Sequence, residues 1–333
     1  MPLEYFTNKD KFLPANLLPK ALYELAVARG ADAQKLLVGT GIFLQDFEND
    51  SQVSCNQLLT LIANAQTLSQ GQDLGFQFGR TLIDLLPDDI QDVLSSAKDF
   101  HHCLKLMALL KPQLYPFMSS FNHIDEDTLY LQFFDPIGLG KQQRFIQEAS
   151  CAALVSLSKL CTGRRLKFSF SFPFARPKYM YEYEESLGTR LEFQAPTLMV
   201  KIAHNDTQIT CKDANPKLHS YALKQVKTQY KVRYSLLEQV RLILRKAPQT
   251  TLPDAAALFD MSPASLKRLL KEHSTSFQQL HDELRRQEAM YYLQIQKLKN
   301  EQTASKMRFT DVNNFRKAVK RWTGLTPNKL RSF

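Results

Sequence analysis

Helical spacing of apolar residues dominates the first hundred positions of the chain. In SCNQLLTLIANAQTL apolar side chains recur every three or four residues, and IQDVLSSAKDFHHCLKLMALL repeats the pattern. This spacing gives each segment one apolar stripe, which is typical of an amphipathic helix packed on a core. We therefore predict that the first part of the chain is mostly helical. The two stripes are Leu58, Leu61, Ile62, Ala65 and Leu68, then Ile90, Val93, Leu94, Ala97, Leu104 and Met107.

Alternation of apolar and polar residues follows, and this is the period of a β-strand. The clearest case is RLKFSFSFPF, in which Leu166, Phe168, Phe170 and Phe172 alternate with Lys167, Ser169 and Ser171. Segments 129–134, 191–194 and 197–203 predict further strands, and segment 141–163 predicts a helix that closes at Gly163. The region up to residue 210 is thus expected to be an α+β domain: helices plus a mainly antiparallel sheet, with one long helix across it.

Periodicity weakens over residues 211–230, which are polar, and we place a linker there. It divides the chain into an N-terminal domain, residues 1–210, and a C-terminal domain, residues 231–333. Every periodic segment of the second domain has helical spacing, so we expect an all-α domain.

Residues 251–273, TLPDAAALFDMSPASLKRLLKEH, predict two short helices joined by a tight turn. The first helix tolerates Pro253 in its first turn, and the chain turns at Asp260. Ser262 followed by Pro263 is a strong start signal for the second helix. This is the pattern of a helix-turn-helix, whose second helix can enter the major groove of DNA.

Residues 300–324, NEQTASKMRFTDVNNFRKAVKRWTG, have the same plan. Phe315, Val319 and Trp322 stand at i, i+4 and i+7 and form one buried stripe. Gly324 suits a C-terminal cap. The stripe would anchor the helix and leave its cations and amides facing outward. A connecting helix, starting at SFQQL, would hold the two units apart, so that they read successive major-groove segments about 34 Å apart.

Charge strengthens this picture. The chain has 333 residues and a formal net charge of +10. Residues 231–333 hold 20 Lys and Arg against 9 Asp and Glu, whereas the rest holds 23 against 24. A basic C-terminal part beside a nearly neutral body indicates a polyanion-binding module. The alternative is a basic surface that serves only solubility.

The C-terminal residues resemble the AraC/XylS family of bacterial transcription regulators. The resemblance rests on MSPASLKRLLKEH, on the connecting helix, and above all on the KRWTGLTP tail. The N-terminal part resembles the arabinose-binding-type effector domain of one branch, through DLGFQFGR and YEESLGTRLEFQAPTLMVKI. The resemblance implies cytoplasmic transcription control, with residues 1–210 as an effector-binding or dimerisation domain. It implies double-stranded promoter DNA as partner, and leaves open a small-molecule effector, a homodimer and contact with RNA polymerase.

Two positions depart from the family pattern, which usually has glycine in the turn of each unit. Here Asp260 and Arg308 stand in the turns. Asp tolerates the left-handed backbone region, whereas Arg does so poorly. Asn300 and Thr303 also occupy positions that are usually aliphatic, so the second unit is expected to be looser or docked differently.

The candidate DNA contacts combine three residue types: Arg suits guanine edges, Asn suits adenine edges, and Lys mostly finds phosphates. They are Ser262, Ser265, Lys267, Arg268, Lys271, Arg308, Asn313, Asn314, Arg316, Lys317, Lys320 and Arg321. In the N-terminal domain, Lys141 with Arg144 and Arg165 with Lys167 are candidates for meeting an acidic effector, or are plain surface charges.

The sequence gives less support to a phosphate-binding loop, a metal site or a reactive cysteine. GLGK at 138–141 lacks the spacing of a phosphate loop and predicts a turn into a helix. His101, His102 and Cys103 have no second cluster near them in sequence, so we expect no metal site, and we expect no cofactor. The five cysteines are scattered without a CxxC, which favours small core residues.

Two alternatives to a specific regulator remain. One is a nucleoid-type protein that binds DNA without sequence preference. The other is a DNA repair enzyme that uses Cys103 or Cys161 and is fused to a DNA-binding domain. The polar start of the chain and the lack of about 18 consecutive apolar residues predict neither a signal peptide nor a membrane span.

Overall fold

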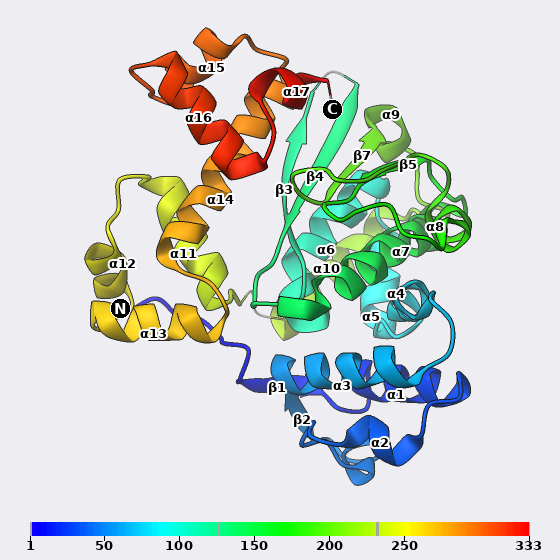
Figure 1. Ribbon diagram of the computed structural model, residues 1–333. Helices are drawn as coiled ribbons and strands as arrows, with labels where there is room; N and C mark the ends of the chain where they lie inside the picture. Colours follow the sequence, from blue (N-terminus) through cyan, green and yellow to red (C-terminus); the bar gives the residue numbers. More distant parts are fainter. Residues whose placement is uncertain (1, 126, 231–232, 333) are drawn as a thin grey trace.

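The computed structural model describes residues 2–125, 127–230 and 233–332. A layer of helices at the N-terminus leads into a sheet, and helices at the C-terminus lie along the other side of that sheet (Figure 1). The first elements are β1 (Lys11–Pro14), α1 (Leu18–Ala28), α2 (Ala33–Leu37), η1 (Leu44–Phe47), β2 (Gln52–Ser54), α3 (Cys55–Leu68), α4 (Leu74–Asp84), α5 (Asp88–Ser95) and α6 (Phe100–Leu114). The predicted helical start is confirmed, with a small β1–β2 pair that the sequence did not indicate.

The main sheet has the strand order β3-β4-β7-β5-β6 and is antiparallel except for the β5–β6 pair. The predicted mainly antiparallel sheet is therefore confirmed. Its strands are β3 (Ser119–Ile124), β4 (Thr128–Phe134), β5 (Phe168–Ser171), β6 (Leu191–Glu192) and β7 (Met199–Ala203). Strand β3 was not predicted. The strand expected from Leu166 to Phe172 is shorter in the structure, where β5 spans Phe168–Ser171.

Helix α7 (Gln143–Thr162) is the long helix expected in this domain. It ends at Gly163, whose φ of +69° is the left-handed cap that glycine permits. The 3₁₀ turn η2 (Gly140–Gln142) leads into it, so GLGK is a turn before a helix. Helices α8 (Met180–Leu187) and α9 (His204–Thr207) complete the domain, whose apolar core reaches from Phe6 to Val226.

The segment expected as a linker contains helix α10 (Pro216–Gln229). Asn215 caps it by accepting hydrogen bonds from the N–H groups of Lys217 and Leu218. The helix packs beside α5, where His219 Nδ1 lies 3.0 Å from the carbonyl oxygen of Val93. Its sequence pattern is weak because only Ala222 and Val226 are buried. The division into domains at this segment stays a prediction.

The remaining elements are helical, as expected of the C-terminal part. They are α11 (Leu236–Lys246), α12 (Leu252–Leu258), α13 (Pro263–Glu272), α14 (Phe277–Met290), the π-helical turn η3 (Tyr291–Ile295), α15 (Asn300–Lys306), α16 (Val312–Thr323) and α17 (Pro327–Arg331). None of the helices within the described residues is long and apolar enough to cross a membrane.

The outer face of β4 is covered by the C-terminal helices. Tyr130 packs with the apolar cluster of the second helix-turn-helix unit, Gln132 Nε2 lies 3.4 Å from Met290 Sδ, and the guanidinium of Arg241 lies 4.7 Å from the ring centre of Phe134. Leu129 and Leu131 belong instead to the core of the N-terminal domain. Alternate residues of one strand therefore join two different cores.

Candidate nucleic-acid interface

The first helix-turn-helix unit consists of α12 and α13. Ser262 is the N-cap of α13, and its hydroxyl accepts a hydrogen bond of 3.1 Å from the N–H of Ser265. Leu266 and Leu270 are buried against the α11–α12 cluster. The predicted helix start is confirmed.

Three cations of α13 are exposed: Lys267, Arg268 and Lys271. The hydroxyls of Ser262 and Ser265 lie 2.9 Å apart, so each already has a partner at the helix start. The outward face of this helix therefore offers cations along its length and hydroxyls at its N-terminus, where the helix dipole favours a phosphate.

The second unit consists of α15 and α16. Asp311 caps α16 by accepting hydrogen bonds from the N–H groups of Asn314 and Asn313, and these bonds lower the pKa of Asp311. Phe315 and Val319 are fully buried, and Gly324 ends the helix with φ +73°. The buried stripe that was predicted from spacing is confirmed at Phe315 and Val319, whereas Trp322 is only partly buried.

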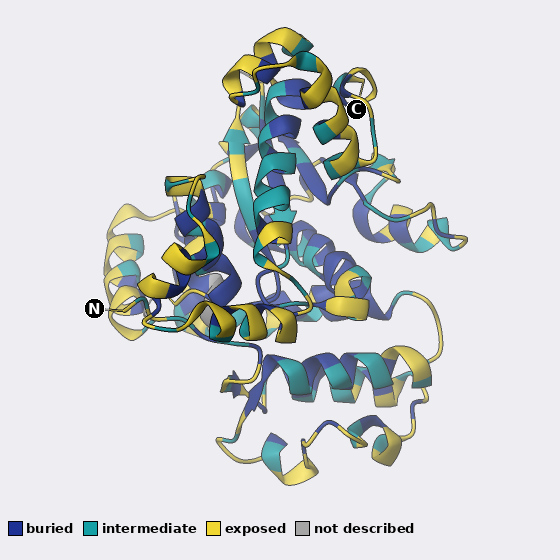
Figure 2. Cartoon of the chain, turned by 60° about the vertical axis from the view of Figure 1, so that its left-hand side comes forward, coloured by how far each residue is buried: buried dark blue, intermediate teal, exposed yellow. Residues whose placement is uncertain are grey.

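All six predicted contact residues of α16 are exposed: Asn313, Asn314, Arg316, Lys317, Lys320 and Arg321. Only one of them forms an ion pair with another described residue: Arg321 Nη2 lies 3.7 Å from Asp282 Oδ1. In Figure 2 the helices of both units carry exposed residues on their outer sides and buried residues on their inner sides. These faces are free for a polyanion.

The two turns that lack glycine both have a positive φ, +54° at Asp260 and +60° at Arg308. The side chain of Arg308 is exposed. The other two departures have partners: Asn300 Oδ1 accepts a hydrogen bond of 2.8 Å from Arg331, and the Thr303 hydroxyl donates to the Lys299 carbonyl at 3.0 Å. The second unit therefore forms in full, with a strained turn.

Replacing Arg308 by glycine is expected to stabilise the second unit relative to replacing it by alanine. Both changes remove the same charge, but only glycine removes the cost of a β-carbon in the left-handed region, about 1–2 kcal/mol, less about 0.5 kcal/mol for the greater freedom of the unfolded chain. Urea unfolding followed by the fluorescence of Trp322 measures the difference. Equal midpoints for Arg308→Gly and Arg308→Ala would show that the turn is unstrained.

Helix α14 connects the two units, as predicted. The Trp322 indole N–H donates to Asp282 Oδ1 at 3.2 Å, which ties α16 to it. Arg241 joins α11 to the same helix, because its Nε and Nη2 donate hydrogen bonds to Glu283 Oε2 at 3.1 and 2.7 Å. Helix α14 is thus hydrogen-bonded to α16 of the second unit and to α11, which packs in one apolar cluster with the first unit.

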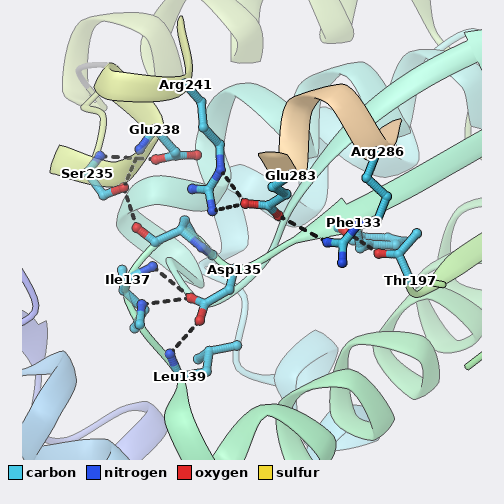
Figure 3. Close-up of polar contacts among 12 residues, drawn as sticks. Phe133, Asp135, Ile137, Leu139, Thr197, Ser235, Glu238, Arg241, Glu283 and Arg286 are labelled. Atoms are coloured by element: carbon cyan, nitrogen blue, oxygen red, sulfur yellow. Dashed lines mark hydrogen bonds and ion pairs between the residues drawn. The ribbon is translucent and has the colours of Figure 1, made fainter. Parts of the chain in front are cut away.

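Contacts between the domains were not foreseen from the sequence. Asp135 accepts hydrogen bonds from the N–H groups of Ile137, Gly138 and Leu139, which folds the 135–139 loop (Figure 3). His273 Nδ1 then lies 2.7 Å from the carbonyl oxygen of Ile137. A β-carbon at Gly138 would stand 2.4 Å from the His273 carbonyl oxygen, so the approach requires glycine.

The N-terminal segment also contacts the first unit. The N–H of Leu3 donates to the Leu258 carbonyl at 3.0 Å, and the rings of Tyr5 and Phe259 meet edge to face. Lys9 Nζ forms an ion pair of 2.8 Å with Glu272 at the end of α13. The apolar residues near the start of the chain are the only sequence feature that indicates these contacts. No sequence rule predicts which distant residues they would contact.

The four candidate effector-binding cations form two separate pairs. Lys141 lies in η2 just before α7 and Arg144 lies in the first turn of α7, whereas Arg165 and Lys167 follow its end. A helix of 20 residues is about 30 Å long. The Arg144 side chain is already hydrogen-bonded to Glu148 at 2.9 Å and to Tyr179 at 2.6 Å. Lys141, Arg165 and Lys167 are exposed. Their role as effector contacts stays a prediction.

The described residues hold no group of three or more His, Cys, Asp or Glu side chains arranged for a metal ion. Of the adjacent histidines, His102 Nδ1 lies 2.8 Å from Asp99 Oδ1. All five cysteines are buried with free thiols, as expected of small core residues.

Two helix-turn-helix units on one connecting helix define a tandem DNA-binding domain preceded by an α+β domain. Comparison with protein families agrees with both parts. Residues 30–208 match the N-terminal arabinose-binding domain of AraC transcription regulators, and residues 255–332 match a helix-turn-helix domain. The first match alone spans more than half of the chain. The chain belongs to the AraC family of transcription regulators.

Two similar proteins have names that identify them as regulators. The chain is 28% identical over 214 residues to the ornithine utilization regulator of Pseudomonas aeruginosa, which covers 62% of this chain and 63% of that protein. It is 26% identical over 191 residues to the regulator VirS of Mycobacterium tuberculosis, covering 56% of each. The alignments thus span less than two thirds of these relatives. The crystal structure of the regulator CdpR from Pseudomonas aeruginosa has 17% identity, a TM-score of 0.40, and coverage of 82% of this chain and 91% of that chain.

Proposed function

We propose that this chain is a sequence-specific transcription regulator that binds promoter DNA in the cytoplasm. One observation carries the proposal: α13 and α16 bury their apolar faces and expose cations and amides, and α14 holds the two helices on one frame. Lys and Arg contacts to phosphates supply salt-dependent affinity, and the amides and Arg side chains select bases.

Binding to fragments of the source genome tests this proposal. The full chain is incubated with the fragments at about 0.15 M salt, where non-specific contacts weaken, and the retained DNA is sequenced. A few promoters that share a two-part site support specific regulation. Uniform recovery of the genome would favour the nucleoid-type alternative.

Arg316→Ala is expected to weaken binding to such a site by about 1–3 kcal/mol, because an exposed Arg on this helix face suits a guanine edge. Titration of a labelled site at several salt concentrations measures both the affinity and its salt dependence. A base contact leaves the salt slope nearly unchanged, whereas a phosphate contact lowers it by about one. Unchanged affinity would contradict either role.

The cysteine-based enzyme finds little support. Cys103 and Cys161 are fully buried. Hydrogen bonds with Cys161 and Cys211, together with burial, raise the pKa of Cys103. A thiol of raised pKa holds little thiolate and is a poor nucleophile. We propose that the chain is not an enzyme, and absence of alkyl transfer to these cysteines tests this.

Control by a small molecule bound in the N-terminal domain is the second part of the proposal. Besides the four cations, that domain has an apolar cavity of about 150 Å³ between α6, α7 and the inner face of β3 and β4. A bound effector would shift the balance between states of different DNA affinity only if it binds one state more tightly. A homodimer and contact with RNA polymerase are further proposed partners.

A further inference from the structure

The apolar cavity of about 150 Å³ in the N-terminal domain lies between a layer of helices and the sheet. Helices α6 and α7 form one wall, and the opposite wall is the face of β3 and β4 that is turned away from α11 and α14 (Figure 1). Leu131 and Phe133 of β4 line the cavity, together with Leu104 of α6 and Leu157 of α7. All of its described lining residues belong to the N-terminal domain.

The lining of this cavity carries no charge. None of its described residues is Asp, Glu, Lys, Arg or His, and the four candidate effector-binding cations, Lys141, Arg144, Arg165 and Lys167, are not among them. An ionised carboxylate or amine placed between these side chains would have no ion-pair partner. Because burying an unpaired charge costs far more than burying an apolar group, the cavity favours an uncharged molecule.

The size of the cavity fits a single ring. An apolar cavity of about 150 Å³ stays dry and holds a molecule of the size of benzene. Such a ring would leave water and gain dispersion contacts that the empty cavity denies to its lining. Met107 and Met118 belong to the lining, and their flexible side chains can adjust to the shape of a ring.

Two hydroxyl groups give this apolar lining a polar position. Ser150 Oγ lies 2.6 Å from the Ile146 carbonyl oxygen and 3.3 Å from the Tyr115 hydroxyl. Because a carbonyl oxygen can only accept, the single hydrogen of Ser150 goes to Ile146, and the Tyr115 hydroxyl donates to Ser150. Burial raises the pKa of Tyr115, so its hydroxyl stays neutral. The Tyr115 oxygen then keeps a lone pair that can accept a hydrogen bond from a ligand.

We propose that this cavity binds an uncharged, single-ring molecule that carries one hydroxyl group, with phenol as the simplest member of the class. The ring lies among the apolar side chains of α6, α7 and β4, and its hydroxyl donates to the Tyr115 oxygen.

A ring in this cavity would contact the two strands on which the C-terminal helices pack, because residues alternate between the two faces of a strand. Phe133 lines the cavity, whereas its neighbour Gln132 lies 3.4 Å from Met290 of α14. On β3 the residue before Phe121 lines the cavity, and the ring centre of Phe121 lies 4.3 Å from the guanidinium of Arg245 in α11. In this regulatory consequence the inference rests on the proposed function, whereas binding itself does not depend on it.

Calorimetric titration of the full chain without DNA tests the site. The probes are phenol, toluene, which lacks the hydroxyl, and benzoate, which has the same ring and a negative charge. We expect saturable binding of phenol with one site per chain, and binding of benzoate weaker by at least about tenfold, because its carboxylate has no cation to meet. No saturable binding of phenol up to about 10 mM, beyond the millimolar end of the affinity scale, would overturn the site. Equal binding of benzoate would overturn the uncharged class.

Filling the cavity locates the bound ring. Ala153 lines the cavity on α7, and Ala153→Phe puts a phenyl group into that space. The matched control is Ala28→Phe, because Ala28 is exposed at the end of α1 and does not line the cavity. We expect Ala153→Phe to weaken phenol binding by at least about tenfold, because a close-packed interior leaves no room for a second ring. Equal phenol binding by the two variants would place the ring elsewhere and overturn the assignment.

Tyr115→Phe tests the hydroxyl contact with a smaller change. It removes only the hydroxyl, and Ser150 keeps its bond to Ile146. We expect phenol to bind about three- to tenfold more weakly, the range that one hydrogen bond contributes, and toluene to bind within about twofold of its affinity for the parent. An equal change for both ligands would show that Tyr115 does not accept a hydrogen bond from the ring hydroxyl.

Repeating the DNA titration with and without phenol measures the regulatory consequence. A change in promoter affinity that Ala153→Phe abolishes supports it, and an unchanged affinity would refute it. Failure of the proposed function looks different: phenol would bind as before, while no promoter is selected from the genome fragments.

Discussion

Replacing Glu283 by alanine is expected to lower the free energy of unfolding by about 3–5 kcal/mol. Glu283 accepts both hydrogen bonds from Arg241, whose side chain is 4% exposed, and the change leaves that cation buried without its partner. Urea unfolding followed by far-UV circular dichroism measures the loss. The pair links α11 to α14 and lies against Phe134 of the sheet, so the loss is expected in the transition of the C-terminal domain.

Two controls separate this pair from an ordinary surface charge. Glu288→Ala breaks an ion pair whose carboxylate side chain is 36% exposed, and its cost should be below about 1 kcal/mol. The double replacement Arg241→Met with Glu283→Leu removes both charges and should recover part of the loss, because well-packed apolar residues can replace a buried ion pair. Recovery is incomplete because Arg286 still loses its ion pair with Glu283. A single Glu283→Ala loss as small as that of Glu288→Ala would mean that water reaches Arg241.

Replacing Phe315 by alanine is expected to cost about 3–5 kcal/mol, mainly in the second helix-turn-helix unit. Phe315 is fully buried in a cluster with Ala304, Met307 and Val319, whereas Trp322, the other aromatic residue of α16, packs against this cluster and is only partly buried. The chain's only tryptophan, Trp322, lies on the same helix and reports this unit selectively. We expect its fluorescence to change at a lower urea concentration than the circular dichroism signal of the N-terminal domain.

The loss of stability in the second unit should also weaken DNA binding. With α16 loosened, Phe315→Ala should lose the contribution of the second unit to promoter affinity, although no side chain on the outer face has changed. Asn314→Ala is the control for stability, because Asn314 is exposed and its removal should leave the Trp322 transition within about 0.5 kcal/mol of the parent. Coincident Trp322 and circular dichroism transitions in Phe315→Ala would show that the units unfold together.

Much of the candidate interface was predictable because it obeys local rules. The Ser262 cap, the stripe through Phe315 and Val319, and the Gly324 cap depend on neighbours in sequence, so the two units could be located from residue spacing. The mainly antiparallel sheet and helix α7 followed from the same kind of reasoning. Helix α10 did not, because a helix with two buried residues has little periodicity to detect.

The docking of the domains was beyond such rules. Gly138 was predicted to lie in a turn, but nothing near it in sequence specifies that its α-carbon approaches His273. The alternation of β4 predicts two faces and does not say what covers the outer one. In the sequence, Arg241 and Glu283 look like ordinary charged residues on helix surfaces. They are 42 positions apart in the chain, and only the fold brings them together.

The sequence by itself determined where most of the helices and strands lie, which helices carry the exposed cations, and to which family the chain is similar, because these depend on propensity, period and charge along short stretches. Only the tertiary structure decided which charges are buried and what covers β4. Those features depend on contacts between residues far apart in the chain, and burial changes the energy of a charged or polar group far more than its neighbours in sequence do.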